Sequence, residues 1–412
     1  MNAIDYLFLF MAFIIWISLS YNLILMFFGY RYFLELKKIE SDYHQVLTYY
    51  PFISIIIPAH NEEKVIEDTL KAIEKLDYPK EKVKVIIVND NSSDNTKGIF
   101  ENFVSKDNRS YFHLVETTKE MGGKGKSSAL NFGMAFAEGE YIVVYDADNT
   151  PEPKSLRILV KTVVSDSHLG AVVGKFRTRN KNKNLLTKFI NIEGLSFQWL
   201  AQGGRWRLFG LTTIPGTNYI INKKILESLG GFDPRAIAED TEISIKLYKN
   251  GYKIRFMPLA VTWEQEPETL RVFIKQRTRW IKGNLYVLFK YFWVNPFNKK
   301  NRYFPDIFNF FITYILFLFA VLVSDSIFII NLIFGFQLNI VGSINFIWFL
   351  TFVLFVLQGS ITVSFEKGEL NRRTFFLIVI SYFTYCQLWL YIAVKALFSF
   401  TKDTILRIEH KW

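Results

Sequence analysis

The strongest constraint on the fold is an uncharged apolar stretch at residues 6–29, "YLFLFMAFIIWISLSYNLILMFFG". A helix of this length can cross a bilayer, which needs about 20 apolar residues. A cleaved signal peptide would need basic residues before the stretch and a small-residue cleavage site after it. Here Asp5 precedes the stretch, and Arg31, Lys37 and Lys38 follow it. The positive-inside rule therefore predicts an uncleaved anchor that leads into a cytoplasmic domain.

Further apolar stretches near the end of the sequence also predict membrane helices. They lie near 307–330, 342–364 and 374–398, and each is long enough to cross a bilayer. Two aromatic segments with scattered charges, 185–202 and 280–297, are typical of helices in the headgroup plane. An ordinary packed amphipathic helix is the alternative interpretation of each.

These patterns divide the chain into three expected parts. An N-terminal anchor occupies 1–35, a cytoplasmic domain 36–282, and an interfacial helix with C-terminal membrane helices 283–412. The formal net charge of +11 suits nucleic acid, an anionic membrane surface or a phosphorylated substrate. No nucleic-acid-binding motif is found in the sequence, so we expect no nucleic-acid partner. A single cysteine, Cys386, excludes an intramolecular disulfide framework.

The middle of the chain alternates between strand and helix patterns. Residues 52–58, "FISIIIP", and 83–90, "VKVIIVND", are typical of buried strands, and 62–76 is typical of an amphipathic helix. Two more strands are predicted at 111–117 and 141–148. This alternation predicts an α/β fold with a mostly parallel sheet and right-handed crossovers.

Polar residues follow several of these strands, at the sheet edge where open α/β folds bind ligands. The stretch "YDADN" places Asp146 and Asp148 one residue apart after a strand. That spacing lets two carboxylates share one hard divalent cation, although an Asx turn or a helix N-cap would explain it too. Asp90 ends another strand, and Pro58 and Glu62 lie where the first strand ends.

Three later motifs complete the pattern. The stretch 122–131, "GGKGKSSALN", combines glycines with two lysines and is suited to holding an anionic diphosphate. Glu239 and Asp240 open a predicted helix, and "QRTRW" occupies 276–280.

The ordered set of these motifs resembles the processive family 2 glycosyltransferases, the group of cellulose, hyaluronan, chitin and poly-N-acetylglucosamine synthases. The resemblance covers residues 50–285 and the flanking membrane layout. It implies a GT-A-like nucleotide-sugar-binding domain and a Mg²⁺ or Mn²⁺ cofactor. The implied partners are a UDP-sugar donor, a growing polysaccharide acceptor and the lipid bilayer.

The resemblance also implies a donor site. Asp90, Glu62 and the strand end at Pro58 would hold the uridine. Lys124 would meet the diphosphate, which leaves Lys126 in a structural or solvated role.

The reacting groups follow from the same resemblance. Asp146 would position the nucleotide sugar and help to bind the cation, while Asp148 would be the cation's main ligand. Asp240, beside Glu239, would be the general base for the acceptor hydroxyl.

The "QRTRW" motif would complete the site. Gln276 and Arg279 would clamp the diphosphate, and Trp280 would stack on the terminal acceptor sugar.

Structural roles stay open for some of these residues. Asp90 could serve as a turn former, Asp240 as a helix N-cap and Trp280 as a membrane-interface anchor. We expect Asp94 to be a turn or N-cap residue only.

A single displacement at the anomeric carbon needs one base and inverts that centre, so an α-linked donor would give a β-linked product. The membrane helices would then line the exit path of the polymer. Gly216 with Thr217, and Arg277, resemble the glucan synthases and favour UDP-glucose and a β-glucan. The alternatives are a poly-N-acetylglucosamine or hyaluronan-like synthase that uses UDP-N-acetylglucosamine, a non-processive lipid glycosyltransferase, and an inactive membrane scaffold.

Overall fold

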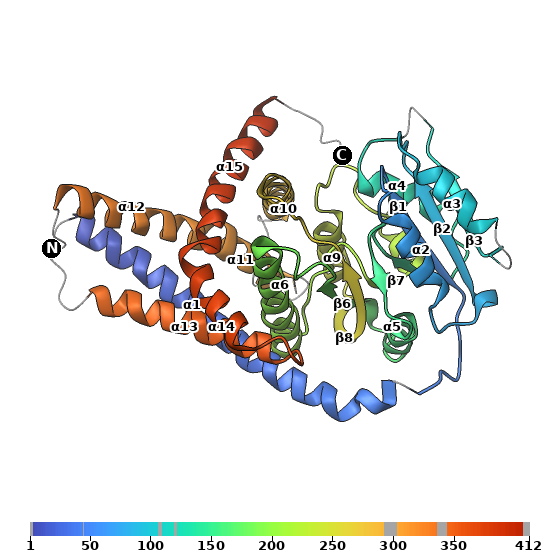
Figure 1. Cartoon of the computed structure of the whole chain (residues 1–412), viewed down its shortest axis with the longest axis horizontal. Helices are drawn as coiled ribbons and strands as arrows, with labels where there is room; N and C mark the ends of the chain where they lie inside the picture. The colour runs from blue at the N-terminus through green and yellow to red at the C-terminus, as the bar shows by residue number, and fades with distance from the viewer. Residues whose placement is uncertain are drawn as a thin grey trace.

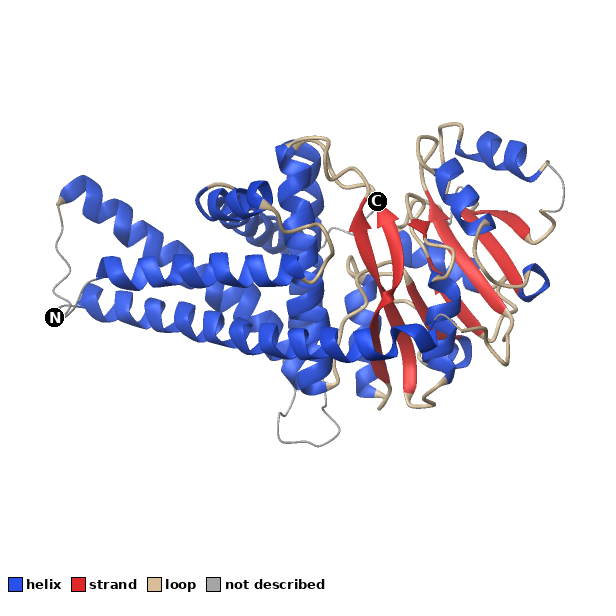
Figure 2. Cartoon of the chain, turned by 60° about the horizontal axis from the view of Figure 1, so that its bottom comes forward, coloured by secondary structure: helices blue, strands red, loops and turns tan. Residues whose placement is uncertain are grey.

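The computed structural model describes residues 3–43, 45–105, 109–118, 122–291, 303–335 and 344–406. Residues 292–297 and 342–343, which belong to expected membrane segments, lie outside this range. Figure 1 shows a sheet with flanking helices on one side and a bundle of long helices on the other, with the first helix running along both. Figure 2 shows shorter helices between the bundle and the sheet.

A single eight-stranded sheet forms the core of the first part, in the order β3-β2-β1-β4-β7-β6-β8-β5. Strands β1 to β4 run parallel, while β7 runs antiparallel to both of its neighbours and β5 antiparallel to β8. The strands are β1 (Ile53–Ala59), β2 (Val83–Asn89), β3 (Phe112–Glu116), β4 (Tyr141–Val144), β5 (Thr150–Pro151), β6 (Leu169–Thr178), β7 (Tyr219–Asn222) and β8 (Lys253–Glu264).

The sheet is mixed: six strands run parallel to one another, as expected, whereas β7 and β5 run in the opposite direction. The expectation rested on the alternation of strands and helices up to residue 148, and β1 to β4 do follow it. Beyond that point β7 inserts between β4 and β6 in the opposite direction. Because of this reversal, the start of β7 lies at the same sheet edge as the end of β4.

Helices cover both faces of the sheet, so its central strands are buried and read as continuous apolar runs. All seven residues of β1 are buried, as the sequence predicted. The flanking helices are α2 (Ile66–Glu74), α3 (Thr96–Val104), α4 (Lys126–Met134), α5 (Ser155–Val164), α8 (Lys223–Ser228) and α9 (Glu239–Lys249), with the short turn η1 (Lys80–Lys82) before β2. The amphipathic helix expected at 62–76 is α2, and its buried face includes Ile66, Leu70 and Ile73.

Four helical segments lie between the sheet and the long helices. They are α6 (Leu185–Phe197), the π-helical η2 (Gln198–Gly204), α7 (Arg205–Phe209) and α10 (Leu270–Tyr291). The segment expected at the membrane surface, 185–202, forms α6 and most of η2. Helix α6 packs between β6 and two of the long helices.

Two glycines let the first helix pack closely against η2. Helix α1 (Ala3–Tyr43) crosses η2, and a β-carbon added at Gly29 would overlap the Trp199 carbonyl. A β-carbon at Gly204 would likewise overlap the Leu25 carbonyl. Only glycine lets two helix backbones approach this closely, so α1 has a fixed position against η2.

The long helices are α1, α11 (Phe304–Phe311), η3 (Ile312–Phe317), α12 (Leu318–Phe334), α13 (Ile344–Ser364), α14 (Arg372–Phe383) and α15 (Tyr385–Leu406). Among the described residues, α1 is long and apolar enough to cross a membrane. Helices α14 and α15 meet at a 41° bend and would make a second span if they act as one. The expected crossings at 307–330 and 342–364 are helical, but their apolar parts are shorter. Four crossings are therefore not established.

The expected domain boundaries fall inside helices. Helix α1 continues past residue 35 to Tyr43, and α10 continues past residue 282 to Tyr291. Continuous helices thus link the expected membrane parts to the sheet domain.

Candidate active site

The loops that follow β1 and β2 hold each other at the carboxyl edge of the sheet. Asn61 Oδ1 accepts hydrogen bonds from Ser93 N at 2.8 Å and from Ser93 Oγ at 3.1 Å. His60 Nδ1 lies 2.7 Å from the Asp90 carbonyl oxygen. Asn61 adopts a left-handed conformation, with φ of 58°, which asparagine tolerates better than most residues. Asp90 therefore lies where hydrogen bonds join the loop after β1 to the loop after β2.

Asp90 is covered by the glycine-rich loop. Its Oδ1 accepts from Thr117 Oγ1 at 2.9 Å and from Gly123 N at 3.1 Å, and the residue is 1% exposed. A buried carboxylate without hydrogen-bond partners would be costly, and these donors satisfy it. Asp90 thus does more than form a local turn, because it ties β2 to the glycine loop.

Asp94 has the structural role expected for it. Its Oδ1 accepts from Thr96 N at 3.0 Å, and its Oδ2 accepts from Glu63 N at 3.0 Å. Both bonds fix the turn that leads into α3.

Lys126 joins motifs that are far apart in the sequence. Its ammonium forms an ion pair with Asp146, lies 3.6 Å from Glu239, and donates to the Gly216 carbonyl oxygen at 2.9 Å. Its side chain is only 17% exposed. Lys126 is therefore not solvated, contrary to one of the two roles expected for it. Lys124, the lysine preferred from the sequence, is exposed.

Gly216 lies beside a third carboxylate near this lysine, that of Asp240. A β-carbon at Gly216 would lie 3.2 Å from Asp240 Oδ2 and 3.6 Å from Lys126 Nζ. The φ of 97° at Gly216 is also unfavourable for other residues. Asp146, Glu239 and Asp240 thus all lie near the Lys126 ammonium.

Thr217 shapes the D-x-D turn. Its Oγ1 accepts from Asp146 N at 2.9 Å and donates to Asn149 Oδ1, and the residue is buried. Because its hydroxyl both accepts and donates a hydrogen bond, Thr217 holds the backbone of the D-x-D turn in place.

Asp240 is the second residue of α9, and the N-cap position belongs to Ala238. The alternative that Asp240 is the N-cap is therefore wrong. Its Oδ1 accepts from Thr241 N at 2.7 Å. Burial, followed by repulsion from Glu239, raises the pKa of Asp240 to about 7, against the opposing effect of Lys126. A carboxylate with a pKa near neutrality is well matched to general base catalysis.

Two more carboxylates, Asp148 of the D-x-D motif and the neighbouring Glu62, have raised pKa values. Burial and then the neighbouring Asp146 raise the pKa of Asp148 to about 6. Burial, followed by repulsion from Asp148 and Asp146, raises the pKa of Glu62 to about 7. Clustered carboxylates of this kind are stabilised in their charged form by a cation.

The donor set fits a divalent cation, because Asp146, Asp148 and Glu62 offer the oxygen ligands that Mg²⁺ and Mn²⁺ prefer. Within the described ranges, no group of three His, Cys, Asp or Glu side chains is arranged as a complete metal site. A cation held here would therefore need further oxygens from a diphosphate or from water.

The "QRTRW" motif lies on α10. Gln276, Arg279 and Trp280 follow an i, i+3, i+4 spacing, which places them on one side of the helix. Arg277 is 2% exposed, and its guanidinium pairs with Glu193 at 3.2 Å and donates to Gln276 Oε1 at 3.1 Å. No described hydrogen bond or ion pair joins Gln276 or Arg279 to the carboxylates around Lys126.

Trp280 has one face covered and another accessible. The Arg277 guanidinium lies 3.8 Å from the centre of its ring, yet Trp280 remains 41% exposed. An indole held flat by a cation in this way presents its free face as a stacking surface.

Two acidic residues at the end of β8 escaped the sequence analysis. Burial, then Glu266 and Asp148, raise the pKa of Glu264 well above its usual range. Burial raises the pKa of Glu266 to about 7, although Arg277 opposes the shift. The stretch "TWEQEPE" carries the same signal as the other motifs, acidic residues after a strand, and could have identified them.

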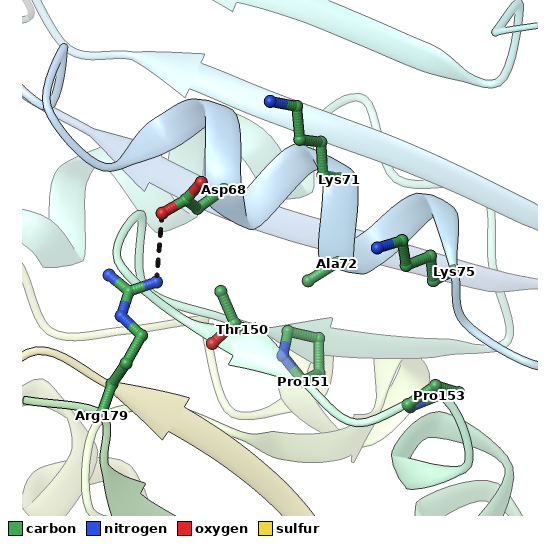
Figure 3. Close-up of a pocket in the computed structure, with 8 residues that line it drawn as sticks. All are labelled: Asp68, Lys71, Ala72, Lys75, Thr150, Pro151, Pro153 and Arg179. Carbon is green, nitrogen blue, oxygen red and sulfur yellow. Dashed lines mark hydrogen bonds and ion pairs between the residues drawn. The ribbon is translucent and has the colours of Figure 1, made fainter.

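A hollow of about 300 Å³ lies beside the D-x-D turn, between α2 and β5 (Figure 3). Arg179 reaches across it toward Asp68, at 3.5 Å. None of the motif residues above lines this hollow, which is bordered by Asp68, Lys71, Ala72, Lys75, Thr150, Pro151, Pro153 and Arg179. It is distinct from the cluster around Lys126.

A mixed sheet whose edge gathers a D-x-D turn, a lysine and an acidic helix start defines a glycosyltransferase of the GT-A-like class. Residues 54–230 match the family model described as "Glycosyl transferase family 2". The chain is 46% identical to the probable glycosyltransferase YdaM of Bacillus subtilis (strain 168), over 97% of this chain and 94% of that relative. The chain therefore belongs to the family 2 glycosyltransferases, and the resemblance found in its motifs is confirmed.

Two further comparisons extend this finding. Over 65% of the chain it is 32% identical to a poly-beta-1,6-N-acetyl-D-glucosamine synthase of Staphylococcus epidermidis, and the match spans 62% of that relative. A solved mannosyltransferase, PcManGT from Pyrobaculum calidifontis in complex with GDP-Man and Mn²⁺, matches with a TM-score of 0.59 at 22% identity. It covers 92% of this chain and 99% of its own, and it supports the fold.

Proposed function

We propose that the chain is a processive, inverting glycosyltransferase that extends a β-linked polymer of N-acetylglucosamine from UDP-N-acetylglucosamine. The observation that carries the chemistry is the convergence of Asp146, Glu239 and Asp240 on Lys126 at the carboxyl edge of the sheet. Acidic groups and one cation at such an edge suit the transfer of a sugar from a diphosphate.

The choice of sugar departs from the glucose favoured by the sequence. That preference rested on Gly216 with Thr217, and on Arg277. Thr217 is buried and uses its hydroxyl to support the D-x-D turn, and Arg277 is buried in an ion pair with Glu193. Structural tasks account for these residues, so they no longer favour glucose. The relatives that make poly-N-acetylglucosamine favour the alternative donor.

The donor would lie between the β1 and β2 loops and the D-x-D turn. Asp90 and Glu62 would face the uridine at the strand end marked by Pro58. Lys126, which already lies among carboxylates, is better placed than the exposed Lys124 to meet the diphosphate.

The reaction would be a single displacement. The acceptor hydroxyl attacks the anomeric carbon, the bond from that carbon to the diphosphate oxygen breaks, and UDP leaves with the bonding electron pair. Asp240 takes the hydroxyl proton as the general base. Because its pKa is raised to about 7, this carboxylate is a stronger base than an ordinary one.

Asp148, with Asp146 and Glu62 nearby, would hold a Mg²⁺ or Mn²⁺ ion. When bound, the cation supplies charge that stabilises the departing diphosphate. Gln276 and Arg279, on one face of α10, would close over that diphosphate. Trp280, on the same face, would stack on the acceptor sugar.

The chain would lie in the cell membrane as a multi-pass protein, with residues 36–282 cytoplasmic and the long helices around the polymer's path. Helix α1 supports this placement by its length and apolar composition. A cysteine placed at the exposed residue Lys97, with Cys386 changed to serine, tests it. An impermeant thiol reagent should label that cysteine only after the cells are opened, and labelling of intact cells would refute the topology.

The activity test offers UDP-N-acetylglucosamine and UDP-glucose, side by side, to the full-length chain in neutral detergent. UDP release and product length are measured, and Asp240→Asn is the inactive control. We expect a long product from UDP-N-acetylglucosamine that a β-N-acetylglucosaminidase degrades. Polymer from UDP-glucose alone would restore the β-glucan interpretation. A single-sugar lipid product would indicate the non-processive alternative, and turnover of neither donor would indicate a scaffold.

A further inference from the structure

A basic pocket lies where the α13–α14 connection meets α6. Its volume is about 270 Å³, and it is lined by Lys181, Asn182, Lys188, Asn191, Ile192, Gly368, Glu369, Asn371, Arg373, Thr374 and Leu377. Helices α6, α13 and α14 contact one another around it. Three of its lining residues are cations, and one is a carboxylate.

The carboxylate in this pocket, that of Glu369, already has hydrogen-bond and ion-pair partners. Glu369 Oε1 accepts from Lys181 at 2.6 Å and from Arg177 at 3.2 Å, and its Oε2 accepts from Asn191 at 3.1 Å. Because these donors occupy both oxygens, Glu369 does not neutralise the other cations of the pocket.

Lys188 and Arg373 therefore remain available. Neither pairs with a carboxylate in the part of the chain that the structure describes. Lys188 comes from α6 and Arg373 from the first turn of α14, so the two charges face the pocket from different helices. Two cations in a concave site suit the oxygens of a phosphate group.

The surroundings of the pocket are apolar and exposed. Leu185, Leu370, Phe375 and Phe376 lie within three residues of lining residues in the sequence, and all four are exposed, with Phe376 at 62%. Exposed aromatic and aliphatic side chains beside a basic pocket are typical of a surface that meets lipid, with chains on the apolar residues and the headgroup on the cations. A soluble phosphate would not require the apolar flank.

The pocket also has a rigid link to the sheet. Glu366, in the same connection as Glu369, accepts from Lys175 of β6 at 2.6 Å and from Trp199 of η2 at 3.2 Å. These bonds hold the α13–α14 connection against the catalytic domain.

We propose that this pocket binds the phosphate headgroup of an anionic membrane phospholipid, with Lys188 and Arg373 as its main contacts. The bound lipid would fix α6 and α14 at the membrane surface. This inference goes beyond the proposed function and rests only on the proposed membrane placement.

The test measures binding of fluorescent phosphatidylglycerol and of equally labelled phosphatidylcholine to the full-length chain in neutral detergent micelles. The test variant is Lys188→Gln with Arg373→Gln. The matched control is Lys183→Gln with Arg372→Gln, which removes two exposed cations next to the pocket that do not line it. We expect the wild type to prefer phosphatidylglycerol, and each pocket cation removed to weaken that affinity by about fivefold. The control should stay close to wild type.

A charge-preserving variant, Lys188→Arg with Arg373→Lys, keeps the test informative if the glutamine variant does not fold. It should retain the preference for phosphatidylglycerol. Equal weakening in the test and control variants would overturn the proposal, because general charge would then explain binding. Displacement by millimolar inorganic phosphate, with no preference between the two lipids, would assign the pocket to a soluble phosphate and overturn it too.

Failure of the membrane placement would look different. In that case the wild type would not float with vesicles of phosphatidylcholine. If only the headgroup site is wrong, flotation persists and the preference for phosphatidylglycerol is missing.

Discussion

Lys126 Nζ lies 3.6 Å from the Glu239 carboxylate, and this contact joins the first residue of α4 to the first residue of α9. The same ammonium pairs with Asp146 of the D-x-D turn. The Lys126 ammonium thus offsets the charge of two carboxylates. One follows a strand, and the other begins a helix. A donor diphosphate that enters this site would meet Lys126 directly.

Replacing Lys126 should therefore abolish transfer. We expect Lys126→Met to lower the rate of UDP release by roughly 10²–10³-fold, because one donor to the developing charge is lost. The matched variant Lys124→Met removes an exposed lysine two residues away and should cost much less. A larger loss in Lys124→Met would return the diphosphate role to Lys124.

Asp240→Asn separates catalysis from binding. The amide keeps the size of the side chain but accepts no proton, so turnover should fall by roughly 10²–10⁴-fold. Calorimetry should show near wild-type affinity for UDP. Asp90→Asn should instead weaken UDP binding, because its proposed partner is the uridine. If Asp240→Asn loses as much UDP affinity as Asp90→Asn, Asp240 has a structural role.

The rate should depend on pH through the same carboxylate. Burial and Glu239 raise the pKa of Asp240 to about 7, and the base acts only when deprotonated. The initial rate should therefore rise from acidic pH to a plateau above neutrality, and fall by about tenfold per pH unit below the midpoint. Rates measured at saturating donor in mixed buffers of constant ionic strength would reveal this. A flat profile down to pH 5 would contradict the assignment of the base.

Removal of divalent cations should stop the reaction. Excess EDTA should abolish UDP release, and added Mg²⁺ or Mn²⁺ should restore it. Asp148→Ala should lose at least about 100-fold in rate, because the cation supplies several kcal/mol to the transition state. Asp166→Ala, which removes a partly exposed aspartate that pairs with His168, is the control. Full turnover in EDTA would rule out the metal role.

Replacing the two arginines of "QRTRW" should have different effects: loss of Arg277 should lower stability, and loss of Arg279 should lower activity. Arg277→Met breaks a pair with Glu193 in which the arginine is 2% exposed, and should destabilise the fold by about 3 kcal/mol. This figure is at the low end for a buried pair because Glu193 remains 25% exposed. Arg279→Met should leave the melting temperature unchanged and reduce transfer. A thermal unfolding series in detergent measures the first effect, and unchanged stability of Arg277→Met would contradict it.

Several features of the site follow from the sequence alone. The apolar runs at β1, β2 and β4 are local patterns, and parallel strands must end at one edge of a sheet. Asp90 and the D-x-D pair were therefore expected there before any contact was known. The acidic pair at 239–240 and the tryptophan of "QRTRW" were likewise identified from short sequence motifs.

The tertiary structure decided which neighbouring residue faces the site. Gly123 and Gly125 adopt positive φ, so the loop turns Lys124 to solvent, and α4 begins at Lys126. The antiparallel β7 brings Gly216 to the same edge, where a β-carbon would press against Asp240 and the φ of 97° favours glycine. Local periodicity depends on residues a few positions apart, whereas these choices depend on contacts between segments about a hundred residues apart. For that reason Lys126, and not Lys124, occupies the centre of the site.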